Sequence, residues 1–356
     1  GIAHIGVLKV LQDAKVPVDC VVGTSMGAIV GGAMATGMPV NDMEQAVTTA
    51  DWDHIFGDKP KRKDIPYFRK RDDEKDYFDF TLTLKDFWPV PPRNLVGVHY
   101  ITQFFRQLTG GLEVEEFDDL PIPYRAIGAD LESGKTVIMR HGDLPLVMRA
   151  SMSVSGVFPP VPYENYLVVD GGIVKNMGID EGRKLCGDVV IAVNVSSPST
   201  NRQKLESLFA VSEQTINIAV QKDMQAQIAT LTPQDVLITP EMGKLSSTDF
   251  KEAPQFIAAG EKAAKASLKQ LQRYALSEAD YQAWQQQVDA RKPKHKPISK
   301  VEITGSNWVS PQVLKSLLAV KKGEVLDQAQ LHDSIDKIYA RGDFVRIGYQ
   351  LLPEAQ

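Results

Sequence analysis

The chain of 356 residues has little of what marks a membrane-spanning, disulfide-framed or metal-binding protein. No apolar run approaches the roughly 20 residues that a membrane-spanning helix needs. Its two cysteines are too few for a disulfide framework and match no zinc spacing, so we expect Cys20 and Cys186 to be core residues. The formal net charge of -5 argues against nucleic acid as a partner, and no signal peptide is recognised. No metal or cofactor is predicted.

What the chain has is an alternation of apolar, strand-like runs with helix-like segments, which is typical of a wound α/β fold with a parallel sheet. A hydrophobic content of 43% is ordinary for a globular chain, and the length predicts two domains. Helices are expected at residues 3–15, 28–38, 202–231 and 251–290, and strands at residues 18–22, 124–129, 136–139, 167–169 and 188–194.

The pentapeptide Gly23-Thr24-Ser25-Met26-Gly27 lies between an expected strand and an expected helix, which is the setting of a nucleophile elbow. Glycine on both sides relieves the crowding of such a turn, and the serine hydroxyl is presented above the sheet edge. The first N–H groups of the helix then point to the same place, where they stabilise negative charge on an attacked carbonyl oxygen. The alternative is a tight glycine turn whose serine only caps the helix.

A nucleophilic serine needs a base, and the histidines are poorly placed to supply one. Those after Ser25 are His54, His99, His141, His295 and His332. The first three lie in stretches without the context of a strand end, and the last two fall in a basic linker and a separate C-terminal module. Asp170 follows a predicted strand, and Gly171 and Gly172 after it allow another backbone to come close. A carboxylate there can take the proton of Ser25 and return it to the leaving group. The alternative is an ordinary Asp-Gly hairpin turn.

These two motifs together resemble the patatin-like phospholipases. Three further segments carry the resemblance: residues 1–8 are similar to the end of the family's glycine-rich oxyanion segment, residues 149–161 to the block before its aspartate, and residues 235–240 to its late strand. The resemblance covers residues 1–275 and implies an α/β/α sandwich with a mostly parallel sheet.

The resemblance also implies roles for individual residues. Ser25 is the nucleophile and Asp170 the base of a Ser-Asp dyad. Gly171 and Gly172 support the aspartate. The residues of the elbow and oxyanion site are Gly1, Gly23, Met26 and Gly27. The implied reaction is hydrolysis of a fatty-acyl ester with release of a free fatty acid, without a cofactor or metal.

The chain departs from the family pattern at its start. The family's oxyanion segment is Gly-Gly-Gly-x-(Arg or Lys)-Gly after a first strand, and Gly1 corresponds to its last glycine. We therefore expect the first strand and the other glycines to belong to a longer chain. Ser155 stands where relatives commonly carry proline.

Residues 51–111 are the least regular part of the hydrolase segment, and we expect them to influence substrate choice. The basic cluster at residues 59–63 indicates either a solvated loop or a contact with anionic lipid headgroups. Phe87 and Trp88 are predicted to touch lipid, with a place in the core as the alternative. The helix that follows carries Tyr100, Phe104, Phe105 and Leu108. These four side chains either form an apolar lip or belong to the core.

The chain changes character at residues 291–297, where basic residues and prolines predict a linker. We therefore assign residues 1–290 to the hydrolase domain and residues 298–356 to a second, small α+β domain. Its expected elements are strands at residues 298–303 and 344–349 and helices at residues 311–318 and 327–341. This strand-helix-helix-strand order resembles a POTRA domain of outer-membrane assembly and secretion proteins.

The two domains in this order resemble a bacterial type V secretion protein of the patatin-barrel kind. The resemblance implies phospholipid or a membrane surface and an outer-membrane β-barrel in cis as partners. The implied location is secreted or on the surface of a Gram-negative cell, and self-association is left open. Three functions compete: a secreted or surface-displayed phospholipase A, a cytoplasmic esterase or lysophospholipase of the same fold, and a catalytically silent lipid-binding or translocation module.

Overall fold

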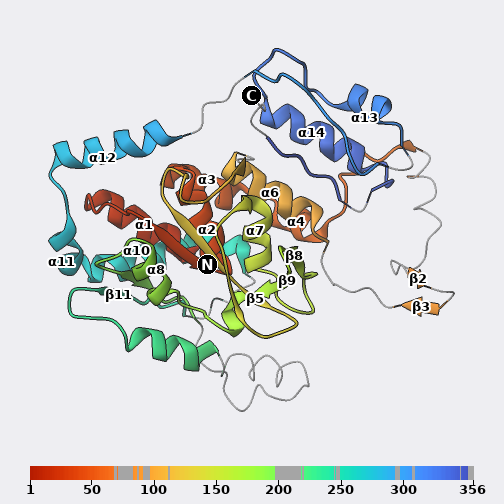
Figure 1. Ribbon diagram of the computed structural model, residues 1–356. Helices are drawn as coiled ribbons and strands as arrows, with labels where there is room; N and C mark the ends of the chain where they lie inside the picture. The colour runs from red at the N-terminus through yellow and green to blue at the C-terminus, as the bar shows by residue number, and fades with distance from the viewer. Residues whose placement is uncertain are drawn as a thin grey trace. The chain divides into compact units, whose positions relative to one another are not determined.

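The structure is a computed structural model (Figure 1). The chain forms two compact units, which are described separately. Unit 1 comprises residues 1–50, 112–155 and 160–292, and unit 2 comprises residues 51–111, 156–159 and 293–356. The structure describes residues 1–67, 70, 83–85, 88–90, 97–110, 113–196, 218, 220–243, 245, 249–292, 297–306, 309–344 and 346–351.

The main sheet of unit 1 is mixed. Its strands are β1 (Val21–Thr24), β5 (Tyr124–Asp130), β6 (Thr136–Met139), β8 (Val161–Tyr163) and β9 (Tyr166–Asp170). Strand β1 is parallel to β5, whereas β6 and β9 are antiparallel to β5 and β8 is antiparallel to β9. The prediction of a mostly parallel sheet is therefore wrong for these strands. Short turns join β5 to β6 and β8 to β9, and strands joined so closely can pair only as antiparallel hairpins.

Strands β1 and β9 share one edge of β5 and meet there end to end. Thr24, the last residue of β1, is opposite Ile127, and Asp170, the last residue of β9, is opposite Gly128. Strand β6 pairs with residues 126–129 of β5 and so occupies the other edge. Because β1 and β9 run in opposite directions, their carboxyl ends face each other, opposite two adjacent residues of β5.

Helices cover both faces of this sheet, as an α/β/α sandwich requires. On one face α2 (Met26–Ala35) packs closely, since a methyl at Gly31 would lie 3.2 Å from Val21 Cγ2. On the other face, a methyl at Gly178, just before α8 (Ile179–Leu185), would lie 2.6 Å from Val22 Cγ1. Successive strand residues such as Val21 and Val22 point to opposite faces. The α/β layering predicted from the sequence is confirmed.

Helix α1 (Ala3–Asp13) lies against α10 (Ala253–Ala266) at van der Waals distance. A methyl at Gly6 would fall 2.0 Å from the Ile257 carbonyl oxygen, and one at Gly260 would fall 2.0 Å from the Ala3 carbonyl oxygen. The apolar face of α1 joins a core with the parallel pair β10 (Ile191–Val193) and β11 (Val236–Ile238). The two glycines allow this contact, because any side chain would force the helices apart.

The remaining elements of unit 1 follow the predictions in part. They are α3 (Val40–Thr49), β4 (Glu113–Val114), β7 (Gly142–Asp143), α7 (Leu144–Ser151), η1 (Gly171–Ile173), η3 (Phe250–Glu252), α11 (Leu268–Leu271), η4 (Gln272–Tyr274) and α12 (Glu278–Arg291). The single helix expected at residues 251–290 is broken, because the Ser277 side chain accepts a hydrogen bond from Asp280 N and starts α12 anew. Of the helix expected at residues 202–231, residues 220–228 are helical and residues 202–217 lie outside the described part.

Unit 2 contains α4 (Trp52–Gly57), β2 (Thr83–Lys85), β3 (Trp88–Val90), α6 (His99–Thr109), α13 (Pro311–Leu317) and α14 (Gln328–Tyr339). The two predicted C-terminal helices are confirmed within a few residues. The two predicted strands are wrong: the described residues of 298–303 and 344–349 form no β-ladder. The carbonyl of Ile347 instead accepts a hydrogen bond from Gln103 Nε2 at 3.0 Å, so side chains of α6 satisfy groups that a neighbouring strand would have paired.

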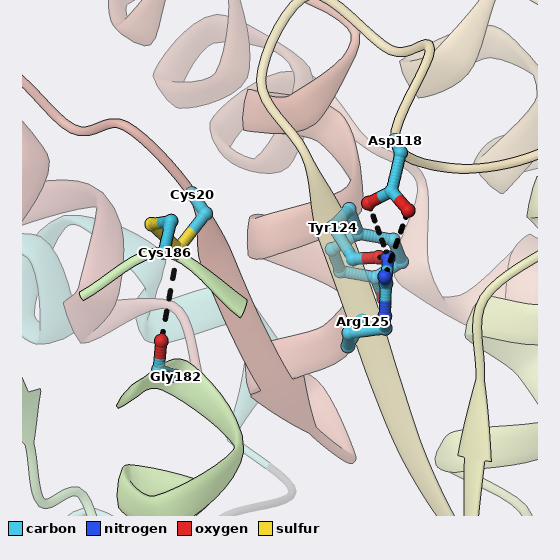
Figure 2. The surroundings of a disulfide bond; sticks show 6 residues. All are labelled: Cys20, Asp118, Tyr124, Arg125, Gly182 and Cys186. Carbon is cyan, nitrogen blue, oxygen red and sulfur yellow. Dashed lines mark hydrogen bonds and ion pairs between the residues drawn. A yellow bond between two sulfur atoms is a disulfide. The ribbon is translucent and has the colours of Figure 1, made fainter. Parts of the chain in front are cut away.

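Cys20 and Cys186 form a disulfide with a Cα–Cα distance of 6.1 Å, which corrects the expectation of two core thiols (Figure 2). The bond joins the segment that leads into β1 to the C-cap of α8, across 166 residues of sequence. Cys186 is exposed and Cys20 half-buried.

None of the helices in the described part of the chain combines the length and the apolar composition that a membrane span requires.

Candidate active site

Ser25 occupies the sharp turn between β1 and α2 with a backbone conformation of φ 55° and ψ −125°. Positive φ is uncommon for a residue with a side chain and persists only where neighbours impose it. A methyl at Gly23 would lie 2.4 Å from the Gly27 carbonyl oxygen, so glycine is obligatory there. At Gly27 a methyl would meet only the His4 ring, at 3.8 Å. The predicted strand-turn-helix order is therefore present, but its steric need for glycine is confined to Gly23.

Ser151 holds this turn in place, a role that sequence reasoning missed. The N–H of Ser25 donates to Ser151 Oγ at 2.9 Å, and the Ser151 hydroxyl donates to the Ile127 carbonyl at 2.6 Å. Ser151 is the last residue of α7 and is fully buried. The available signal was a serine in a buried helix end, where a hydroxyl needs partners.

Asp170 faces the Ser25 side chain, although 145 residues separate them in sequence. Ser25 Oγ donates to Asp170 Oδ2 at 2.5 Å, while Asp170 Oδ1 accepts from Gly172 N at 2.8 Å. Burial raises the pKa of the Asp170 carboxyl above its ordinary value, against the opposing effect of these two hydrogen bonds. Both carboxylate oxygens are thus held, one by the hydroxyl it would deprotonate.

Gly171 permits the close backbone approach that the sequence predicted. A methyl there would lie 2.3 Å from the Ile127 carbonyl oxygen. At Gly172 a methyl would lie 3.1 Å from Asp170 Oδ1, which is tight but not prohibitive. The glycine pair lets η1 turn away from β5 directly after Asp170, and this turn aims the carboxylate at the elbow.

Backbone donors lie beside the serine at the start of α2. The helix begins at Met26. The N–H groups of Met26 and Gly27 therefore lie in its first turn, where no preceding helical carbonyl can accept their hydrogen bonds. Gly1 is next to them, since a methyl on Gly1 would lie 3.6 Å from Met26 Cβ. Gly23, Met26 and Gly27 thus lie next to Ser25 along the turn, Gly1 lies against the Met26 side chain, and the positive end of a ten-residue helix is at Ser25.

The described histidines near the elbow and elsewhere have partners other than the dyad. Burial lowers the pKa of His4 to about 3, and its Nδ1 lies 2.6 Å from the Gly1 carbonyl oxygen. His141 pairs with Glu164 at 2.6 Å, and His99 stacks on Tyr339 within unit 2. Among the hydrogen bonds of the described residues, none joins a histidine to Ser25. No group of three or more potential metal ligands occurs in that part of the chain either.

A cavity of about 480 Å³ runs along β1 in unit 1. Gly23, Gly27 and His4 line it beside the elbow, and Cys20 lines it beside the disulfide. Its other walls are largely apolar and include Val7, Leu11, Val30, Met34 and Ile191.

The predicted lipid contacts fall mostly outside what the structure describes. Phe87 is not among the described residues, and of Trp88 only the backbone is described, paired with Lys85 in the β2–β3 hairpin. The four apolar side chains of α6 are buried in unit 2, so the core alternative is correct for them. Phe104, for example, packs its ring 5.2 Å from that of Trp52. The basic residues of the cluster at 59–63 are exposed.

Residues 1–182, half of the chain, match the family model of the patatin-like phospholipases. The chain belongs to this family. An uncharacterized NTE family protein of Mycobacterium tuberculosis is 26% identical to this chain over 289 residues, which are 75% of this chain and 44% of that protein.

Two relatives whose names give a domain or an activity are similar over a shorter region. A patatin-like phospholipase domain-containing protein of Caenorhabditis elegans is 30% identical over 200 residues, 55% of this chain and 13% of that protein. A lysophospholipase of Neurospora crassa is 28% identical over 201 residues, 56% of this chain and 12% of that protein. The chain thus spans less than half the length of each of these relatives.

Proposed function

We propose that the protein hydrolyses the fatty-acyl ester of phospholipids, a phospholipase A reaction, with Ser25 as nucleophile and Asp170 as general base. The observation that carries the proposal is the 2.5 Å hydrogen bond from Ser25 Oγ to Asp170 Oδ2. It places a carboxylate at the hydroxyl of an elbow serine, within the reach that proton transfer requires. Family membership supports the same class of reaction.

The geometry supports a two-step acyl transfer. In the first step the Ser25 proton passes to Asp170 as Oγ attacks the ester carbonyl carbon. The negative charge on the carbonyl oxygen is stabilised by the N–H groups of Met26 and Gly27. Asp170 then gives the proton to the departing alcohol oxygen, which leaves an acyl-serine. In the second step water loses a proton to Asp170 and attacks the acyl carbon, and Ser25 Oγ regains the proton as the fatty acid departs.

Burial of Asp170 favours this role. Because burial raises its pKa, the carboxylate is a stronger base than a solvated aspartate and still returns its proton readily. The Gly172 N–H at Oδ1 fixes the carboxylate plane while Oδ2 faces the serine.

Exposed apolar side chains next to the dyad support a lipid substrate. Ile173, three residues after Asp170, is 40% exposed, and Val154 is 45% exposed. Val154 adjoins Ser153, whose carbonyl accepts a hydrogen bond from Asp170 N at 3.0 Å. Apolar side chains exposed beside a reactive serine suit the acyl chain of a lipid better than a polar ester. The fungal relative is named as a lysophospholipase, which points to the same substrate class.

Labelling with a fluorophosphonate probe tests the dyad. We expect the wild-type protein to be labelled and S25A and D170N to lose labelling and phospholipid hydrolysis while retaining their circular dichroism spectra. Labelling that survives in D170N would assign the base to another residue. A folded wild-type protein that neither labels nor hydrolyses would favour the catalytically silent lipid-binding module.

A secreted or surface-displayed location, in a type V protein of the patatin-barrel kind, is the second part of the proposal. The Cys20–Cys186 bond supports an oxidising compartment, because such bonds are rare in the cytosol of most organisms. The helix pair α13 and α14 occupies the positions that the POTRA resemblance implies, although the two flanking strands do not form.

Expression of the protein from its complete gene in a Gram-negative host tests the location. We expect protease added to intact cells to degrade the protein and thiol alkylation to find both cysteines oxidised. A protease-protected protein with two free thiols would favour the cytoplasmic esterase instead.

A further inference from the structure

The segment after Asp170 makes contacts that the acyl-transfer mechanism does not use. We call residues 171–176 the post-aspartate loop. It begins with η1, and the N–H of Lys175 donates to the Gly171 carbonyl at 2.8 Å, so the loop closes on the glycine that follows the aspartate. Its far end is therefore tied to the position of Asp170.

The same loop is tied to the elbow by one side chain. Thr24, the residue before Ser25, donates its hydroxyl to the Lys175 carbonyl at 3.0 Å. The contacts form a closed ring: Ser25 Oγ bonds Asp170, Gly171 follows Asp170, Lys175 bonds Gly171, and Thr24 bonds Lys175. The ring joins segments 151 residues apart at its Thr24–Lys175 link.

Three further contacts hold the loop from the outside. The Lys175 ammonium lies 2.7 Å from Asp180 Oδ2 and 3.1 Å from Glu181 Oε1, both in the first turn of α8. The N–H of Asn176 donates to Asp223 Oδ2 at 2.9 Å. Lys175 is thus held at its N–H, its carbonyl and its ammonium, and only the carbonyl contact reaches the nucleophile turn.

We infer that Thr24 is a positioning residue, whose hydroxyl holds the post-aspartate loop so that Ser25 and Asp170 stay within proton-transfer distance. The inference rests on the dyad of the proposed function and adds a residue to it. The dyad bond alone joins two side chains that can rotate. The Thr24–Lys175 bond joins a side chain on a strand to a backbone group, and so restrains the relative position of the two segments that carry the dyad.

A displacement of about 1 Å in such a pair costs on the order of 100-fold in rate. Valine has the shape of threonine without the hydroxyl and is well tolerated in strands. We therefore expect T24V to fold and to lower kcat for a soluble short-chain ester by about 10- to 100-fold, with KM changed less than about twofold. T24S keeps the hydroxyl and should retain at least a third of wild-type kcat.

Thr36 offers a matched control. Its hydroxyl donates to the Ala33 carbonyl at 2.7 Å at the end of α2, so T36V removes the same kind of bond away from the dyad. We expect T36V to keep wild-type kcat. Wild-type kcat in T24V, or a loss in T24S as large as that in T24V, would overturn the inference, because the hydroxyl would then have no positioning role.

Amide hydrogen exchange tests the restraint without activity. In T24V we expect the amides of residues 171–176 to exchange at least about tenfold faster than in the wild type, and in T36V to be unchanged. Unchanged exchange in T24V would refute the restraint. If the wild-type protein hydrolyses no ester but T24V still shows the faster exchange at residues 171–176, the proposed function is refuted and the restraint by Thr24 is supported.

Discussion

Replacement of Ser151 by alanine tests how the strained elbow is maintained. The Ser151 hydroxyl accepts from the Ser25 N–H at 2.9 Å and donates to the Ile127 carbonyl at 2.6 Å. S151A removes both bonds and leaves a backbone donor without its partner beside a residue at φ 55°. Water cannot readily replace a hydroxyl that is fully buried.

The expected cost follows from these two bonds. An unsatisfied buried polar group costs about 1–3 kcal/mol, and the Ile127 carbonyl, with two lone pairs, suffers less than the Ser25 N–H. We therefore expect S151A to lose about 2–4 kcal/mol of the free energy of unfolding. For a unit of this size, each kcal/mol lowers Tm by about 2–4 °C. The released elbow should also lower kcat by about 10- to 100-fold.

Ser153 provides the control, because it is also fully buried and close in sequence. Its hydroxyl donates to the Arg149 carbonyl at 2.8 Å, and its contact with Asp170 is made by the backbone carbonyl, which alanine keeps. S153A should cost about 1 kcal/mol and leave kcat within about threefold of the wild type. Thermal unfolding and ester hydrolysis measure both quantities. Equal effects of the two substitutions on kcat would refute the role of Ser151 at the elbow.

Three other outcomes are expected. Burial raises the pKa of Asp170 above its ordinary value of 3.8, so its contribution to stability is fully present below the unfolded-state pKa and is lost as pH rises through the folded-state pKa. D170N should therefore be inactive yet unfold at a higher temperature than the wild type at pH 7, and wild-type hydrolysis should fall as pH drops through the raised pKa; a D170N protein less stable than the wild type would contradict this. Substituting Cys20 or Cys186 by serine should each remove about 2–5 kcal/mol of stability, and the double variant no more than either, as thermal unfolding would show. Joint replacement of Val154 and Ile173 by serine should reduce hydrolysis of phospholipid vesicles while sparing a soluble short-chain ester; equal loss on both substrates would indicate that they act on the dyad instead.

The elbow was predictable because its requirements are local. A Cβ at position 23 would collide with the Gly27 carbonyl four residues away, so both the cause and the effect of the constraint lie within one pentapeptide. Strand β1 begins at Val21 rather than at residue 18, since the residues before it run toward the disulfide. The predicted start of the strand was therefore wrong by three residues, whereas the predicted order of strand, turn and helix was correct.

The C-terminal strands show the opposite case. Residues 298–303 alternate apolar and polar side chains, yet alternation describes only the faces of a strand, and a ladder also needs a neighbour with free N–H and C=O groups. Residues near Ile347 found side chains of α6 as partners instead. The disulfide was missed for a similar reason, because two cysteines 166 residues apart carry no local sign of pairing.

The sequence by itself determined the two groups of the proposed dyad: a serine in a turn that only glycine at position 23 permits, and an aspartate followed by glycines at a strand end. Tertiary structure alone decided that they meet. Strands β1 and β9 pair with the same edge of β5, and their ends lie opposite Ile127 and Gly128. This pairing brings Ser25 Oγ within 2.5 Å of Asp170 Oδ2, although 145 residues separate them. It also supplied Ser151, whose hydroxyl matters only beside the Ser25 N–H. No local sequence pattern encodes which residues, 126 and 145 positions away, become the hydrogen-bond partners of Ser25.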